Sequence, residues 1–189
     1  MKKSYLILLV ITLCSTAMFS QDQAENNVSQ NFNELKINMT NLIGFKWADI
    51  AYERTLNEES SIGINVLTRI GSDRNNDGDA GLDEYRTFSI TPYFRQFFGK
   101  KYAQGFFVEG FAMVHSGEDQ NYDFDSITQN GSYSYDKYTD LAIGISAGAK
   151  FVTKRGFVAE IYLGLGRDLL DQSNLDVVGR GGIALGYRF

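Results

Sequence analysis

Apolar and polar residues alternate with a period of two along most of this 189-residue chain. In residues 34–40, for example, Leu35 and Ile37 alternate with Lys36 and Asn38. Such alternation is typical of β-strands, because successive side chains of a strand point to opposite sides. The same pattern recurs in seven later stretches, which are residues 47–55, 61–70, 87–95, 105–115, 140–151, 157–166 and 177–189. The pattern therefore predicts an all-β chain of eight strands.

Eight amphipathic strands fit two architectures. A soluble barrel or sandwich packs its apolar face inside, whereas a membrane barrel turns that face to lipid and its polar face to the lumen. The connections favour the membrane barrel, because short and long ones alternate, except for a brief one near residues 44–45. The short ones are residues 56–60, 99–104 and 153–155, and the long ones are residues 71–84, 117–137 and 168–176. We therefore predict an eight-stranded antiparallel up-and-down transmembrane β-barrel, with strands of about ten residues that suit a bilayer crossing.

The start of the chain predicts export. Lys2 and Lys3 precede a short apolar run that contains the single cysteine, Cys14, and Ser20 marks a cleavage position. After Ser20 no run of about 18 apolar residues follows, so no transmembrane helix is expected. We expect a signal peptide in residues 1–20, a flexible lead-in in residues 21–33 and the barrel in residues 34–189.

Aromatic residues and the single proline add two expectations. The 14 Phe and 11 Tyr predict aromatic belts at both ends of the barrel, where the bilayer meets water. One belt would contain Phe97, Phe98, Phe151, Phe157, Tyr187 and Phe189, and the other Phe45, Trp47, Tyr85 and Tyr138. Pro92 cannot donate to a strand ladder, and we expect a β-bulge there.

Charged residues at the polar positions predict an ionic lumen. The bases expected inside are Lys36, Arg69, Arg95, Lys150, Arg180 and Arg188, and the acids are Asp49, Glu53, Glu109, Asp140 and Glu160. They should pair, because isolated buried charge is costly, and they should fill the lumen of so small a barrel. The alternative is a narrow polar pore or a binding site for a small solute. Glycines at the same positions would make room for the long side chains: Gly144, Gly148, Gly164, Gly182 and Gly186.

Residues 73–84 have the spacing of an EF-hand calcium loop, with Asp73, Asp77, Gly78 and Glu84 at the required positions. An EF-hand needs a helix on each side of the loop, whereas both flanks here have the period of a strand. The interpretation is therefore an acidic, solvated loop. Specific calcium binding is the alternative.

The long connections are strongly acidic, with net charges of −4, −4 and −3, within a chain of net charge −5. This acidic end argues against nucleic acid as a partner, and it could bind divalent cations that bridge lipopolysaccharide phosphates. His115 is followed by Ser116, but adjacent strand residues point to opposite faces and cannot easily form a catalytic pair. We therefore expect no enzyme, and no catalytic, cofactor or metal site.

Three segments carry a resemblance to a known family: residues 50–64 ("IAYERTLNEESSIGI"), residues 92–111 and the end "GGIALGYRF". The chain resembles the small outer-membrane β-barrel domains common in bacteroidete-type genomes, a family whose function is largely unassigned. The resemblance implies a monomeric barrel in the outer membrane of a Gram-negative cell, with lipid and lipopolysaccharide around it and both termini in the periplasm. The final Phe189 matches the signal that the barrel-assembly machinery recognises. The role expected is structural or one of surface interaction, and a lipid-modifying enzyme is the third alternative after the pore.

Overall fold

The computed structural model describes residues 32–70, 86–99, 101–125, 130–170 and 176–189, with the backbone alone for the described residues between 119 and 136. These residues belong to one unit, Asn31–Phe189. The predicted signal peptide, most of the lead-in and the calcium-like loop 73–84 lie outside the described residues.

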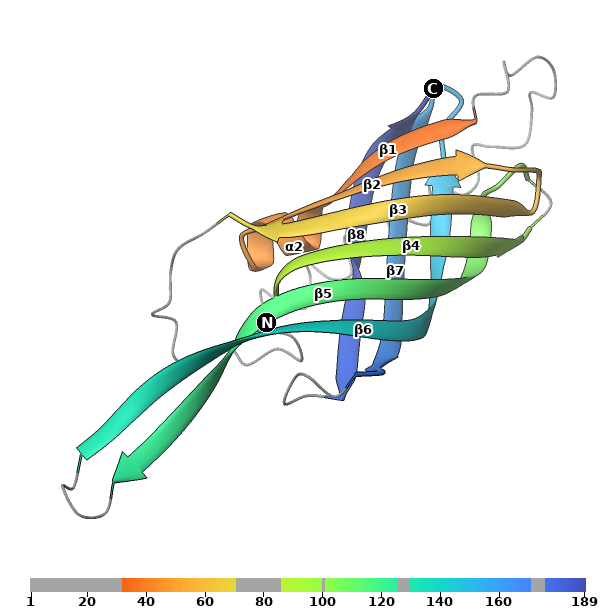
Figure 1. Cartoon of the computed structure of the whole chain (residues 1–189). Helices are drawn as coiled ribbons and strands as arrows, with labels where there is room; N and C mark the ends of the chain where they lie inside the picture. Colours follow the sequence, from red (N-terminus) through yellow and green to blue (C-terminus); the bar gives the residue numbers. More distant parts are fainter. Residues whose placement is uncertain (1–31, 71–85, 100, 126–129, 171–175) are drawn as a thin grey trace, which may run out of the picture. The chain divides into compact units, whose positions relative to one another are not determined.

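The described strands form one closed antiparallel barrel, in which each strand pairs with the next and β1 pairs with β8 (Figure 1). The elements are β1 (Asn33–Asn38), α2 (Met39–Gly44), β2 (Trp47–Thr55), β3 (Ser60–Arg69), β4 (Arg86–Phe98), β5 (Gly105–Asp125), β6 (Asn130–Val152), β7 (Phe157–Asp168) and β8 (Val177–Arg188). The prediction of an all-β, eight-stranded antiparallel barrel is confirmed. In the described part of the chain, no helix has the length and apolar character needed to cross a membrane.

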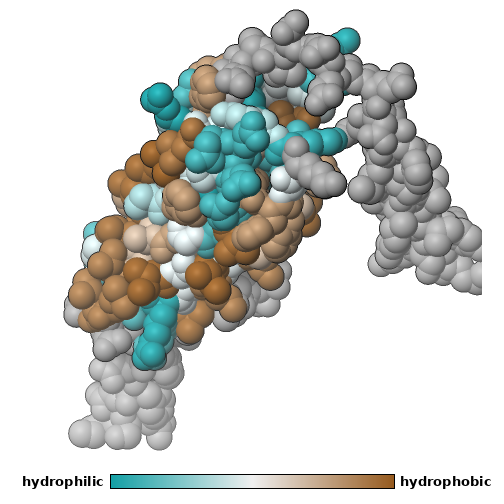
Figure 2. Space-filling model, turned by 90° about the vertical axis from the view of Figure 1, so that its right-hand side faces the viewer, coloured by the Kyte–Doolittle hydropathy of each residue, from teal (hydrophilic) through white to brown (hydrophobic). Residues whose placement is uncertain are grey.

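The outer and inner faces of the barrel differ in polarity, as the alternation predicts. In β1, Leu35 and Ile37 are 50% and 41% exposed, whereas Glu34 and Lys36 are 0% and 1% exposed. The other strands repeat this arrangement, and hydrophobic side chains cover much of the outer surface that Figure 2 shows. Apolar residues therefore face outward and charged residues lie inside a closed sheet.

The first strand ends two residues earlier than its alternation predicts. Met39 and Thr40 belong to the short helix α2, which replaces the brief connection expected near residues 44–45. The Asn38 side chain begins the helix, because its Oδ1 accepts hydrogen bonds from the backbone N–H groups of Thr40 and Asn41. Such capping is a local device that a period of two does not reveal.

The connection predicted as a long loop in residues 117–137 is wrong. β5 and β6 continue through most of it as a paired ladder that ends at Asp125 and Asn130. In Figure 1 the two strands extend together past the ends of β4 and β7. Polar composition hid this ribbon, since both of its strands are rich in Asp, Asn and Ser.

The bulge predicted at Pro92 lies elsewhere. The β4–β5 register shifts between Arg86 and Phe88, at the other end of β4. In the β4–β5 ladder, Ile90 pairs with Val114 and Tyr93 pairs with Phe111, which is the same register. No pair is formed at Thr91 and Pro92 between them. The missing N–H thus interrupts this ladder locally without inserting a residue.

The aromatic belts differ between the two ends of the barrel. Five of the aromatic residues predicted for one end are exposed: Phe98, Phe151, Phe157, Tyr187 and Phe189. Phe106, which the sequence did not predict for this belt, is exposed as well. Phe97, however, is buried inside, and so are Trp47 and Tyr138 from the belt predicted at the opposite end. Only Phe45 of that predicted belt is exposed among the described residues, while Tyr85 lies outside them. Alternation decides these cases, because the three buried rings occupy inward positions of their strands.

Two lumen glycines make room for aromatic rings rather than for charged side chains. Gly144 lies opposite Phe111 and Gly148 lies opposite Phe107, and a Cβ at either glycine would collide with the ring. Only at Gly186 would a Cβ meet the stem of a charged residue, Lys36, as expected. Aromatic residues that cover strand glycines stabilise register, since ring and glycine fit only when they face each other.

We expect Gly144→Ala to destabilise the barrel by about 1–3 kcal/mol, because the new methyl group overpacks the interior. The added Cβ would meet the Phe111 ring and the backbones of Leu165 and Gly166. Gly110→Ala is the matched control, since a Cβ at Gly110 has no atom within 4 Å. Urea unfolding of both variants tests the prediction, and equal midpoints would contradict it.

Candidate functional site in the barrel lumen

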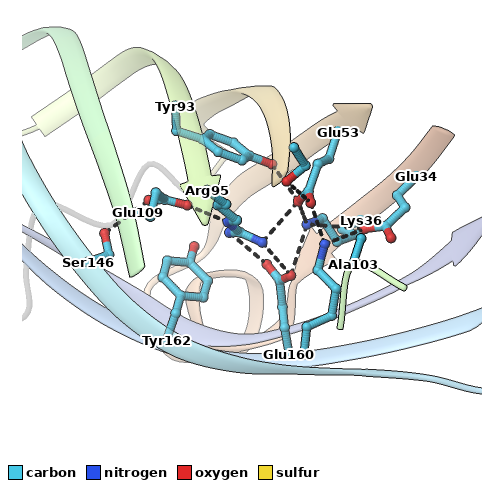
Figure 3. A network of polar contacts seen from close by, with 12 residues as sticks. Glu34, Lys36, Glu53, Tyr93, Arg95, Ala103, Glu109, Ser146, Glu160 and Tyr162 are labelled. Atoms are coloured by element: carbon cyan, nitrogen blue, oxygen red, sulfur yellow. Dashed lines mark hydrogen bonds and ion pairs between the residues drawn. The ribbon is translucent and has the colours of Figure 1, made fainter. Parts of the chain in front are cut away.

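An ionic network crosses the lumen and draws on nearly every strand (Figure 3). Four glutamates and five basic residues form one connected set of ion pairs. Its members are Glu34, Lys36, Glu53, Arg95, Glu109, Lys150, Glu160, Arg180 and Arg188. β3 has no charged member among them but supplies Ser61, whose Oγ donates to Glu53 Oε1 at 2.6 Å.

Arg95 is the hub of this lumen network. Its Nε lies 2.6 Å from Glu109 Oε2, and its Nη1 lies 2.9 Å from Glu53 Oε2 and 2.7 Å from Glu160 Oε2. Its Nη2 also donates to Glu160 Oε1 at 3.1 Å. A guanidinium suits this position, because its rigid fork of five N–H donors can bind several carboxylates at once.

The two lysines surround Glu53 from other strands. Lys36 forms ion pairs with Glu53 and with Glu160 at 2.9 Å, and Lys150 forms ion pairs with Glu53 and with Glu34 at 2.8 Å. All of these side chains are at most 2% exposed. Glu53 also accepts from the Tyr93 hydroxyl at 3.2 Å. Its buried charge is thus compensated by three bases and hydroxyl donors, as burial requires.

Two arginines of β8 extend the network along the barrel axis. Arg180 Nη1 lies 2.6 Å from Glu109 Oε1, and Arg188 Nη2 lies 2.6 Å from Glu34 Oε1. Arg188 also donates to the backbone oxygen of Ala103, at 2.9 Å. β8 is thereby tied to β5 at one level and to β1 and the β4–β5 turn at another.

Aromatic layers lie on both sides of the charges. Toward one end, Phe97, Ala103, Phe107, Tyr162 and Ala184 form an apolar cluster, and toward the other Tyr93, Phe111, Met113, Ala142 and Val178 form a second one. The Arg95 guanidinium carbon lies 4.3 Å from the centre of the Phe107 ring and 4.7 Å from that of Tyr93. These cation–π contacts hold the guanidinium between rings. The lumen is therefore filled in successive layers of rings and charges.

The β4–β5 turn closes the lumen beside Arg188. Ala103 in this turn is fully buried, and its backbone N–H donates to the Glu58 oxygen at 2.7 Å. Its backbone has a positive φ of 42°, which is rare for a residue with a Cβ. A turn that would otherwise point into solvent is thus folded into the mouth of the barrel.

A second polar group lies further along the lumen. His115 Nε2 is 2.9 Å from Asp168 Oδ1, and the His115 ring meets the Tyr138 ring edge-on at 5.7 Å. Asp49, which is also buried, accepts hydrogen bonds from the side-chain amides of Asn41, at 2.5 Å, and Asn65. His115 is buried in the lumen and is therefore absent from the outer face of the barrel. Among the described residues, no three His, Cys, Asp or Glu side chains form a group that could hold a metal ion.

Most of the charges predicted to face the lumen do so. Ten of the eleven lie inside, and only Arg69 is exposed, at the end of β3. The prediction omitted Glu34, Arg86 and Asp168, which are all buried. Glu34 shares the parity of Lys36 and was detectable, whereas Arg86 and Asp168 lie at strand ends whose limits a period of two leaves open.

Comparison with known proteins adds no assignment. No family model, no curated protein and no solved structure matches this chain. The geometry of the barrel is therefore the basis for a functional assignment.

Proposed function

We propose that the protein is an outer-membrane β-barrel with a closed lumen and a structural or surface-interaction role. The observation that carries the proposal is the inverted arrangement of the closed sheet. Leu163 and Ile145 are 74% and 70% exposed on the outside, while Lys36 and Arg95 are each 1% exposed inside. Lipid around the barrel would remove the cost of exposed apolar surface, which water would impose.

Features of the two chain ends support the same location. The basic and apolar first twenty residues have the character of an export signal. At the other end, Phe189 exchanges two backbone hydrogen bonds with Asn33, at 2.8 and 3.1 Å, and so completes the β1–β8 seam. The pairing of β8 with β1 closes the barrel, and such a closing strand suits insertion by an assembly machinery that recognises it. Both termini would then lie in the periplasm.

The direct test is fractionation followed by electrophoresis with and without boiling. We expect the protein in the outer-membrane fraction, soluble only with detergent, and the unboiled sample to migrate differently from the boiled one. That difference arises because a folded barrel resists unfolding by the detergent of the gel. Protein recovered in the aqueous fraction as a monomer without detergent would overturn the proposal.

The layered lumen predicts the absence of passage for ions and small solutes. Arg95 and Lys36 both form ion pairs with Glu160 across the interior, and the two aromatic clusters lie on either side of Arg95. Proteoliposomes that contain folded protein should swell in sugar solutions no faster than protein-free vesicles, and planar bilayers should show no channel steps. Solute-dependent swelling would favour the narrow pore instead.

A further inference from the structure

The paired ribbon of β5 and β6 has an outer edge that no described strand covers. β4 pairs with β5 only as far as Gly117, whereas the β5–β6 ladder continues for eight more pairs, from Glu118 with Lys137 to Asp125 with Asn130. On the other side, pairing of β6 with β7 begins at Ala142. Within the described residues, the ribbon is therefore a two-stranded sheet with two free edges (Figure 1).

The free edge of β5 carries backbone groups that can pair with another strand. The Ser116 oxygen accepts from Thr87 Oγ1 of β4 at 3.1 Å, so the even-numbered residues here direct their backbone groups toward the β4 side. In a regular strand that parity continues at every second residue. Beyond the end of β4, residues 118–125 therefore offer a row of N–H and C=O groups, the usual template for an added strand.

We propose that this β5 edge binds an extended, basic segment of another polypeptide as an additional strand. Residues 118–125 contain Glu118, Asp119, Asp123 and Asp125 and no base, a net charge of −4. Charge complementarity of this strength favours a cationic partner and increases its association rate. It also disfavours a second copy of this chain, since two β5 edges would bring equal negative charges together. The ribbon is independent of what surrounds the barrel, so the inference does not rest on the membrane location.

The ladder register further defines the partner. Three of the four acids fall at odd-numbered positions of β5, which share a face with Asp136, the residue opposite Asp119. The even positions share a face with the aromatic residues, since Tyr122 lies opposite Tyr133 and Gln120 opposite Tyr135. Directly opposed residues of neighbouring strands belong to one face. The partner segment should therefore alternate basic and apolar residues, and this alternation distinguishes strand addition from simple charge attraction.

A register-preserving deletion tests the inference on the full barrel. Removing residues 119–124 and 131–136 places the pair Glu118–Lys137 next to the pair Asp125–Asn130. Because an even number of residues, six, is removed from each strand, the remaining residues stay on their original faces. The probes are two fluorescein-labelled peptides of equal composition, (Lys-Val)4 and Lys4Val4. Fluorescence anisotropy is measured with protein in micelles of a neutral detergent, with empty micelles as the background.

We expect the alternating peptide to bind the whole chain at least tenfold more tightly than the block peptide does, and at least tenfold more tightly than it binds the shortened variant. Equal affinity for both proteins or both peptides, or no binding at all, would overturn the inference. If the shortened variant does not fold, the triple variant Asp119→Asn, Asp123→Asn, Asp125→Asn serves in its place and should also bind at least tenfold more weakly. A dimer of the whole chain that sedimentation detects, and that the deletion abolishes, would show a second copy on the edge instead.

Discussion

Arg95→Leu is expected to lower the free energy of unfolding of the barrel by about 3–5 kcal/mol, the cost of breaking a buried ionic set by removing one partner. The variant would leave Glu53, Glu109 and Glu160 without the guanidinium that contacts all three. Each of these carboxylates keeps another base, but in an interior closed by rings the oxygens that lose Arg95 cannot recover their hydration. Urea unfolding of the protein in lipid vesicles, followed by tryptophan fluorescence from Trp47, measures the change.

Arg69→Leu is the matched control for this charge removal, because Arg69 is exposed at the end of β3. Loss of an exposed charge should change stability by at most about 1 kcal/mol. Adding Glu160→Gln to Arg95→Leu should cost less than the sum of the two single changes, because one of the carboxylates that lost Arg95 is then neutral. Equal effects of Arg95→Leu and Arg69→Leu would show that the network contributes little to stability.

Leu163→Arg is expected to destabilise the barrel in lipid vesicles by about 2–4 kcal/mol, the cost of a cation on the lipid side near mid-bilayer. Leu163 lies in the middle of β7 and is 74% exposed on the outer face. In a barrel surrounded by water, the same exposed substitution would be neutral or favourable. The sign of the effect therefore decides what the outer face contacts.

Leu56→Arg is the control for depth, because Leu56 is also exposed but lies in the turn after β2. Near the bilayer surface a cation costs only about 0–1 kcal/mol. Vesicle unfolding titrations of both variants give the comparison. An unchanged midpoint for Leu163→Arg would contradict a lipid-facing surface even if the ionic interior proved essential.

Local pattern determined the strands of this protein and their two faces. Alternation depends on neighbours two residues apart, so Leu35 and Ile37 could be separated from Lys36 before any partner strand was known. The same rule places Trp47, Phe97 and Tyr138 inside, although their aromatic character suggested belts. Composition competed with parity in these cases, and parity was correct because backbone geometry leaves a strand residue only two directions.

The pairing of charges, the helix and the ribbon depended on the closed sheet. Lys36 and Glu160 are 124 residues apart in sequence, and they meet because the register of β7 with β8 and the β1–β8 closure bring them to one level of the lumen. Alternation states that both face inward but contains no information on which charges share a level. The continuation of β5 and β6 past the barrel follows from cross-strand hydrogen bonding, which polar residues support as well as apolar ones do. Residue type along the chain thus set the faces, and the register between distant strands decided the contacts.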